Sequence, residues 1–171
     1  MAIAILWRRL FAADGLINTI LGIRIGWLGN ADTAMWVLII LSVWQFGSSM
    51  LLFLASMKQI PESLYDAAYV DGAGGIRAFF TITVPLLTPT IFFNLVMQSI
   101  NAFLIFAQAQ LITDGGPLNS TRFYVLYMYE TSFEFSKAGY GAALGWIIVL
   151  ILMLYTLFLF WTKKFWVYEG E

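Results

Sequence analysis

The chain has 171 residues, of which 61% are hydrophobic types and only 11% are charged. Average soluble domains carry roughly 25% charged residues, and a soluble chain of this size could not bury so much apolar surface, so the composition argues against a soluble enzyme. The formal net charge of −1 supplies no basic surface for nucleic acid. Cysteine and histidine are absent from the sequence, which excludes disulfides, thiol nucleophiles, imidazole catalysis and Cys or His metal sites.

The first thirty residues divide into a short apolar run and a loop-like segment. Residues 1–6 are apolar, but Arg8 and Arg9 end the run before it could cross a bilayer. This pattern is typical of the last turns of a span that begins earlier, and an interfacial anchor is the alternative. Residues 12–30 have the Gly, Asn and Asp content of an exposed loop.

Three stretches without any charged residue follow, at 33–57, 78–113 and 138–162. A spanning helix needs about 20 apolar residues, so each stretch can hold one span. The second stretch is too long for one straight span and carries two prolines near its start. We therefore predict spans over about 35–56, 86–111 and 140–161. The predicted fold is all-α, a polytopic membrane helix bundle with three full spans and a partial N-terminal span.

The loop between the first two predicted spans, residues 58–83, has the pattern of two short helices joined by a glycine turn. Pro61 and Glu62 suit the start of a helix. Glycines at 72, 74 and 75 disfavour its continuation, and apolar residues resume helical spacing from Ile76 until Pro85. Periodicity alone fits equally well an amphipathic connector that lies on the membrane surface.

The spacing within this loop resembles the cytoplasmic signature of the inner-membrane permease subunits of binding-protein-dependent ABC importers. That signature reads Glu-Ala-Ala, three residues, Gly, nine residues, Ile, one residue, an aliphatic residue and Pro. The chain matches it with Asp66-Ala67-Ala68, Gly72, Ile82 and Val84-Pro85. Asp66 replaces the usual Glu and Val84 the usual Leu. Two further motifs are similar to the carbohydrate and glycerol-phosphate branch of this family: the sequence Asp71-Gly72-Ala73 and the run from Thr113 to Thr121. We expect the run from Thr113 to Thr121 to form a turn of defined shape.

The resemblance implies that this loop carries a short coupling helix that docks on a cytoplasmic ATP-binding subunit, itself a dimer. The implied coupling residues are Asp66, Ala67, Ala68, Asp71, Gly72, Ala73, Ile82 and Pro85. No phosphate-binding GxxxxGK[ST] motif occurs in the chain, so ATP hydrolysis is expected in that partner, and the chain itself is not expected to be an enzyme. No catalytic residue, cofactor or metal is expected.

The resemblance also implies a second permease subunit, an extracytoplasmic solute-binding protein and a lipid environment, with no nucleic-acid partner. The implied location is the prokaryotic plasma (inner) membrane, with loop 58–83 and the C-terminus in the cytoplasm. The sequence alone does not fix this orientation, because the two sides carry four and five Lys and Arg residues.

Four amide side chains mark the second predicted span: Asn94, Gln98, Asn101 and Gln108. Their spacing of i, i+4, i+7 and i+14 places them on one helix face. Amides in hydrocarbon need partners, so this face should point to the bundle interior or to water. Amide donors and acceptors match the hydroxyls of a sugar, which predicts a substrate pathway. Interhelical hydrogen bonding is the alternative.

We expect residues 1–171 to form a single transmembrane permease domain that resembles the C-terminal part of an importer permease and is N-terminally incomplete relative to the family. Its expected cargo is a sugar or a related polyol or glycerol phosphate. The alternatives are a permease for a non-sugar solute and a non-transporting membrane anchor or assembly fragment. A secondary transporter or channel would need intramembrane charges or inverted repeats, and neither is visible.

Overall fold

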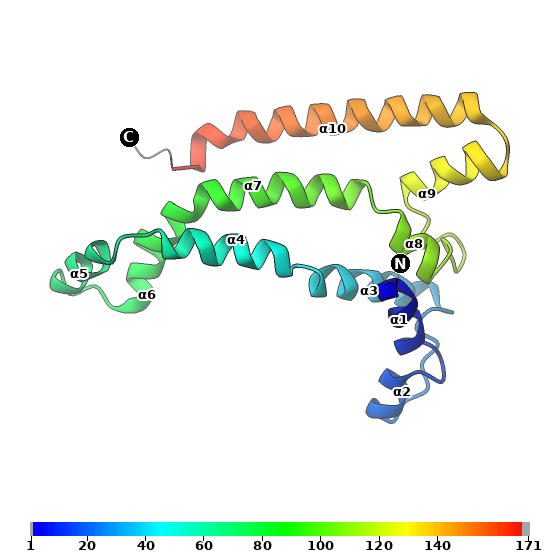
Figure 1. Ribbon diagram of the computed structural model, residues 1–171, viewed down its shortest axis with the longest axis horizontal. Coiled ribbons are helices and arrows are strands. Elements are labelled where there is room, and N and C mark those ends of the chain that lie inside the picture. The colour runs from blue at the N-terminus through cyan, green and yellow to red at the C-terminus, as the bar shows by residue number, and fades with distance from the viewer. Residues whose placement is uncertain (1, 169–171) are drawn as a thin grey trace. The chain divides into compact units, whose positions relative to one another are not determined.

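A computed structural model describes residues 2–168 (Figure 1). These residues form two compact units. Unit 1 contains residues 2–45 and 101–151, and unit 2 contains residues 46–100 and 152–168. Every regular element in the described part of the chain is helical, as predicted. Met1 and residues 169–171, which belong to the predicted apolar run and to the C-terminal tail, lie outside the described residues.

Unit 1 is built on a core of nine buried apolar side chains. Its elements are α1 (Ala2–Leu10), α2 (Leu16–Leu21), α3 (Ala31–Trp44), α8 (Ala107–Ile112), α9 (Tyr124–Tyr129), the π-helix η2 (Glu130–Glu134) and the first half of α10 (Ala138–Trp166). The core residues are Ala4, Trp7, Phe11, Val37, Leu38, Leu41, Ala109, Ile112 and Leu126. Four helices therefore share one core, because α1, α3, α8 and α9 each contribute buried apolar side chains to it.

The segment predicted as an exposed loop, residues 12–30, is instead organised around the buried side chain of Asn18. Its Nδ2 donates hydrogen bonds to the carbonyl oxygens of Ala13 (3.0 Å) and Ile25 (2.8 Å). Its Oδ1 accepts a hydrogen bond from Trp27 Nε1 at 2.7 Å. The side-chain amide of Asn18 thus forms hydrogen bonds with two backbone carbonyls and one indole. These bonds satisfy buried polar groups and hold residues 12–30 in a defined conformation around α2.

The turn predicted from the run Thr113 to Thr121 is present in unit 1. Thr121 is fully buried, and its Oγ1 lies 2.7 Å from Thr113 Oγ1 and 2.8 Å from the carbonyl oxygen of Gly116. Asp114, Gly115 and Asn119 adopt positive φ angles, which Gly, Asn and Asp tolerate better than other residues. Local side-chain hydrogen bonds and backbone chemistry therefore give this connection a defined shape.

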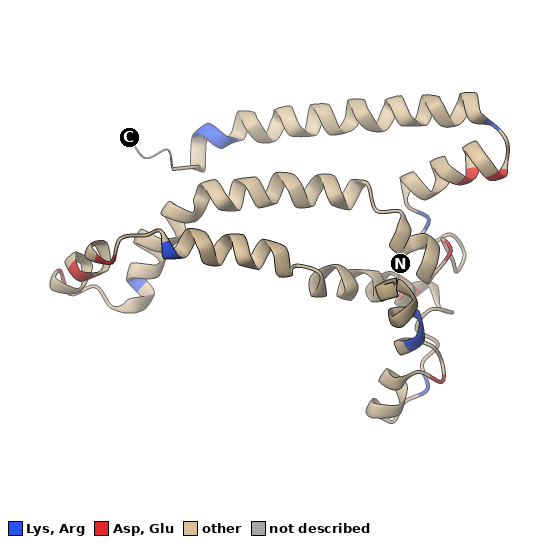
Figure 2. Cartoon of the chain, viewed as in Figure 1, with Lys and Arg blue, Asp and Glu red and all other residues tan. Residues whose placement is uncertain are grey.

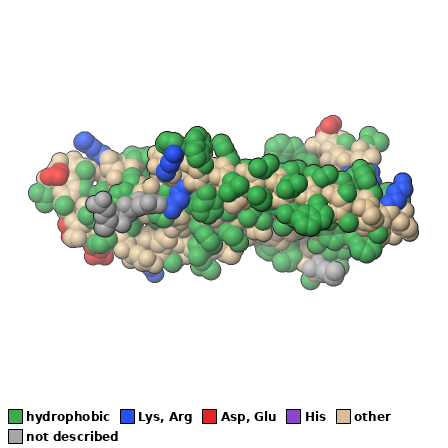
Figure 3. Space-filling view, turned by 90° about the horizontal axis from the view of Figure 1, so that it is seen from above, with side chains coloured by type: hydrophobic (Ala, Val, Ile, Leu, Met, Phe, Trp, Pro, Cys, Tyr) green, Lys and Arg blue, Asp and Glu red, His purple; other side chains and the backbone are tan. Residues whose placement is uncertain are grey.

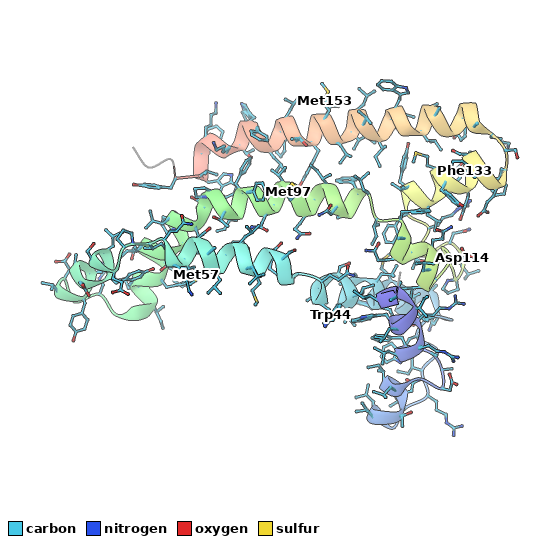
Figure 4. The ribbon with its side chains drawn as sticks, viewed as in Figure 1. Trp44, Met57, Met97, Asp114, Phe133 and Met153 are labelled. Carbon is cyan, nitrogen blue, oxygen red and sulfur yellow. The ribbon has the colours of Figure 1, made fainter. Side chains whose placement is uncertain are left out.

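Unit 2 contains α4 (Gly47–Lys58), α5 (Glu62–Val70), α6 (Gly75–Ala78), the π-helix η1 (Phe79–Thr83), α7 (Val84–Phe103), whose last residues reach unit 1, and the second half of α10. The helices α4 and α7 lie side by side and antiparallel (Figure 1). The ring of Phe92 on α7 packs edge-on against Phe160 and Trp166, with centroid distances of 5.1 and 6.0 Å. The side chain of Met153 projects outward from the surface of α10 and is 55% exposed (Figure 4).

Three helical stretches are long and apolar enough to cross a membrane: Ala31–Lys58, Gly75–Phe103 and Ala138–Trp166. Their middles carry no charged residue, as the uninterrupted tan ribbon in Figure 2 shows. Exposed apolar side chains run along α10 (Figure 3). Trp146, Leu154 and Phe158 of this helix are each more than half exposed. The predicted spans 35–56 and 140–161 lie within the first and third stretches, although Gln45 and Phe46 separate α3 from α4.

The helix in the second predicted span has different bounds from the predicted 86–111. It begins at Gly75, because η1 leads α6 into α7 without interruption. It ends at Phe103, because Phe106 leaves the helical region with φ −137° and ψ −66°, while its ring packs against Tyr129 at 5.0 Å. Pro89 lies inside α7 and cannot donate to the carbonyl of Pro85; the Thr88 hydroxyl donates to that carbonyl instead, at 2.6 Å.

Candidate functional site

The connection between α4 and α7 contains a short helix that closes with a glycine. In α5 the N-cap is Pro61, so the proline precedes the helix by one residue. At the other end, the Ala73 N–H donates to the carbonyl of Ala68 (2.9 Å) and the Gly72 N–H to that of Tyr69 (3.0 Å). This pair of bonds is a Schellman motif, and the φ of +75° at Gly72 is the conformation that the motif requires. The predicted glycine turn is therefore confirmed.

The second short helix predicted for this loop is not a separate element. After the turn, α6 continues through η1 into α7, and the Val84 N–H bonds to the carbonyl of Phe79, five residues earlier. A wide π-helical turn just before Pro85 is compatible with a proline, which cannot donate a helical hydrogen bond of its own. Ile82 and Pro85 consequently belong to the same continuous helix as the predicted amide face.

A hydroxyl pair joins α5 to the π-helical turn. The Tyr65 hydroxyl lies 2.8 Å from Thr83 Oγ1, within hydrogen-bonding distance. Thr83 is 3% exposed and Tyr65 is half-buried. Neither residue could be singled out from the sequence, because neither belongs to the family signature and eighteen positions separate them. Only the fold brings them together.

The outer surface of α5 combines acidic and apolar side chains. No residue of α5 is buried, and Glu62 and Asp66 on the helix and Asp71 at its end are exposed. These carboxylates are the red residues of α5 and its C-terminal turn in Figure 2. Tyr69 and Val70 are 81% and 84% exposed, and Ile76 just beyond the turn is 80% exposed. Such apolar exposure on and next to a short connecting helix is typical of a protein-binding surface.

The amide face divides at the end of α7. Asn94, Gln98 and Asn101 lie on α7, but Gln108 lies on α8 beyond the break at residues 104–106, so the four amides do not share one helix. Gln98 Nε2 donates to Ser49 Oγ on α4 at 2.6 Å. The buried Asn94 donates to the carbonyl of Thr90, one turn earlier in the same helix, at 3.0 Å. Asn101 is exposed and Gln108 is half-buried.

These contacts make Gln98 an interhelical hydrogen-bond donor, which is the alternative that the sequence left open. A second bond between α4 and α7 connects Ser56 Oγ and Thr90 Oγ1 at 2.7 Å, and neither residue could be singled out from the sequence.

Within residues 2–168 no three Asp or Glu side chains gather in a way that could hold a metal ion.

Long apolar helices joined by an exposed amphipathic helix define a polytopic helical membrane protein. Residues 1–165 match the family described as binding-protein-dependent transport system inner membrane component, and the chain belongs to this family. This is a family of transport permeases and not of enzymes.

Curated relatives extend the match over most or all of the chain. The probable ABC transporter permease protein YesP of Bacillus subtilis strain 168 is 50% identical over 179 residues, covering 100% of this chain and 58% of YesP. The sulfoquinovosyl glycerol transport system permease protein SmoG of Agrobacterium fabrum strain C58 is 37% identical, covering 83% of this chain and 48% of SmoG. The lactose transport system permease protein LacF of Rhizobium radiobacter is 32% identical, covering 96% of this chain and 58% of LacF. The chain thus spans about half to three fifths of the length of these relatives.

A solved structure has the same fold. A chain in the crystal structure of a bacterial ABC transporter involved in the import of the acidic polysaccharide alginate superimposes with a TM-score of 0.79. The match covers 95% of this chain and 60% of that chain, at 20% sequence identity. The two chains therefore share a fold.

Proposed function

We propose that this chain is part of the membrane-spanning subunit of an ATP-driven importer for a sugar or a related polyol or glycerol phosphate. The family match supports this role, as do the names of relatives that transport sulfoquinovosyl glycerol, lactose and sn-glycerol-3-phosphate. Because the family match extends over residues 1–165, it also supports a single permease domain. No observation favours a non-transporting anchor over this role.

The observation that carries the proposal is the exposed surface of α5 and the turn that follows it. The family signature begins on a formed helix that has no buried residue, and Tyr69, Val70 and Ile76 are at least 80% exposed. In our proposal these apolar side chains enter a cleft of a cytoplasmic ATP-binding subunit. The carboxylate of Asp66 would face a cation there, while Ala67, Ala68 and Ala73 permit close approach.

Co-purification of the ATP-binding subunit tests this docking. We expect Tyr69→Glu and Val70→Glu to abolish capture of the subunit from detergent extracts, because each buries a carboxylate in an apolar contact. Leu118→Glu is the matched control, since Leu118 is 91% exposed but lies in the turn between Thr113 and Thr121. Equal capture by all three variants would contradict the role of α5, whereas no capture by the parent chain would contradict the importer assignment itself.

The remaining partners and the orientation follow from the same proposal. A second permease subunit would complete the pathway, and a solute-binding protein would deliver the cargo from outside. The chain would lie in the inner membrane, with residues 58–83 and the C-terminus in the cytoplasm. Of the amides predicted for the substrate pathway, exposed Asn101 and half-buried Gln108 are better candidates for solute contact than Asn94 and Gln98, whose amide groups already donate within unit 2.

A further inference from the structure

We propose that Tyr65 and Thr83 are positioning residues whose hydrogen bond transmits movement of α5 to the base of α7. This inference rests on the proposed function, because it supposes that α5 is moved by an ATP-binding subunit. It adds a specific link between that helix and the membrane helix. The observation behind it is the 2.8 Å contact between the Tyr65 hydroxyl and Thr83 Oγ1.

The covalent route from α5 to α7 is poorly suited to transmit a push. It passes through residues 71–75, which include Gly72, Gly74 and Gly75. A Cβ built on any of these three glycines would meet no atom within 4 Å, so each of the three positions lies in open space. Glycine is also the residue with the greatest backbone freedom. A direct side-chain bond across the loop bypasses this compliant segment.

The bond reaches α7 at the place where that helix is easiest to bend. Thr83 is the last residue of η1 and precedes Val84 and Pro85. A π-helical turn followed by a proline has an irregular backbone hydrogen-bond pattern, and kinks form at such places. Because Thr83 is 3% exposed, its side chain has little freedom to absorb a displacement. A shift of Tyr65 would therefore act directly on the turn.

From Thr83 the movement has a connected path into the rest of unit 2. The helix α7 is bonded to α4 through Thr90 and Ser56, and through Gln98 and Ser49. Near its base it also accepts a hydrogen bond from the backbone of the C-terminal segment, where the Tyr168 N–H lies 2.8 Å from Thr88 Oγ1. A displacement at η1 would be shared by these neighbours rather than lost in one helix.

The test uses the complete transporter, purified with its ATP-binding subunit and reconstituted in lipid. The sequence of 171 residues contains no cysteine, so Met97→Cys on α7 gives one labelling site within it, and any cysteines elsewhere in the complex are replaced before the nitroxide spin label is attached. Met97 is 44% exposed and is labelled in Figure 4. The spectrum is compared between the nucleotide-free state and the state trapped with ATP and orthovanadate. We expect Tyr65→Phe and Thr83→Val each to reduce the nucleotide-dependent spectral change to below one third of the parental change, with the subunit still bound.

Further variants separate transmission from a general structural role. Thr83→Ser keeps the hydroxyl and should retain the parental change, and Tyr168→Phe, which removes a hydroxyl but keeps the backbone bond, should also retain it. The double variant should resemble either single variant, because both remove the same bond. A full spectral change in Tyr65→Phe, additive losses in the double variant, or loss of the bound subunit would each overturn the proposal. A parental spectrum that does not change between the two nucleotide states would also overturn this proposal. Failure of the parent to bind the ATP-binding subunit would instead overturn the proposed function.

Discussion

At the scale of single residues, Gly141 of α10 lies in close contact with Ser132 of η2. A Cβ at this position would overlap the hydroxyl of Ser132 and lie 2.9 Å from the Ser132 Cβ. We expect Gly141→Ala to destabilise the protein by about 1–3 kcal/mol, because the two segments would have to separate. The measurement is thermal unfolding of the detergent-purified protein, followed by intrinsic tryptophan fluorescence.

Gly145 provides the matched control for this prediction. The nearest atom to a Cβ there is Met128 Sδ at 3.7 Å, which is an ordinary contact, so Gly145→Ala should unfold at nearly the parental temperature. Adding Ser132→Gly to Gly141→Ala removes the overlapping atoms and should restore part of the lost stability. If Gly141→Ala alone proved as stable as Gly145→Ala, the close approach of η2 to α10 would be wrong.

A second residue-scale prediction concerns the amide of Asn18. In Asn18→Asp the shape is nearly unchanged, but the two hydrogen bonds donated to the carbonyls of Ala13 and Ile25 are lost. A buried acceptor without a partner costs about 1–3 kcal/mol, so we expect a clear drop in the unfolding temperature. Asn30→Asp is the control, because the Asn30 side chain only accepts a hydrogen bond, from the Asp32 N–H, and an aspartate accepts equally well. Equal behaviour of the two variants would contradict the hydrogen-bond assignment at Asn18.

At the scale of helices, the polar residues of α7 hold it to α4. The Gln98–Ser49 bond is 2.6 Å long and joins side chains 49 positions apart. A double-mutant cycle with Gln98→Leu and Ser49→Ala should give a coupling energy of about 0.6 kcal/mol, the average for such bonds within membranes. Unfolding in detergent measures it. The pair Gln98→Leu and Ser56→Ala, whose side chains bond to different partners in unit 2, should give no coupling.

The helical fold was predictable because charge-free stretches of sufficient length have few alternatives in a membrane. The glycine turn at Gly72 was predictable because its backbone requirement is local. The end of α7 was not predictable from the sequence, because Leu104, Ile105 and Phe106 continue the apolar pattern of the helix. The helix ends where the ring of Phe106 packs against Tyr129, a residue distant in the sequence. The partners of the amides were likewise hidden, because hydrogen bonds such as Gln98–Ser49 depend on how helices are placed together.

At the scale of the whole molecule, the long helices leave most of their apolar surface uncovered. In the most apolar 18-residue window of α10, only 11% of the residues are buried, although its mean hydropathy is 2.6. Surface of this kind needs lipid or further membrane helices around it, since water would make its exposure costly. Exposed carboxylates on and just after α5 and cations at the end of α10 then belong outside the hydrocarbon.

The proposed orientation can be tested on the intact membrane, because the chain contains no cysteine that would need removal. Single variants Tyr69→Cys and Leu118→Cys place thiols at sites that are 81% and 91% exposed. In the proposed topology one crossing by the helix Gly75–Phe103 separates the two sites, so they should lie on opposite sides of the membrane. We expect a membrane-impermeant maleimide to label Leu118→Cys in intact spheroplasts, and Tyr69→Cys only after the membrane is broken. Labelling of Tyr69→Cys from outside would leave α5 without access to a cytoplasmic ATP-binding subunit, and the coupling role would have to be abandoned.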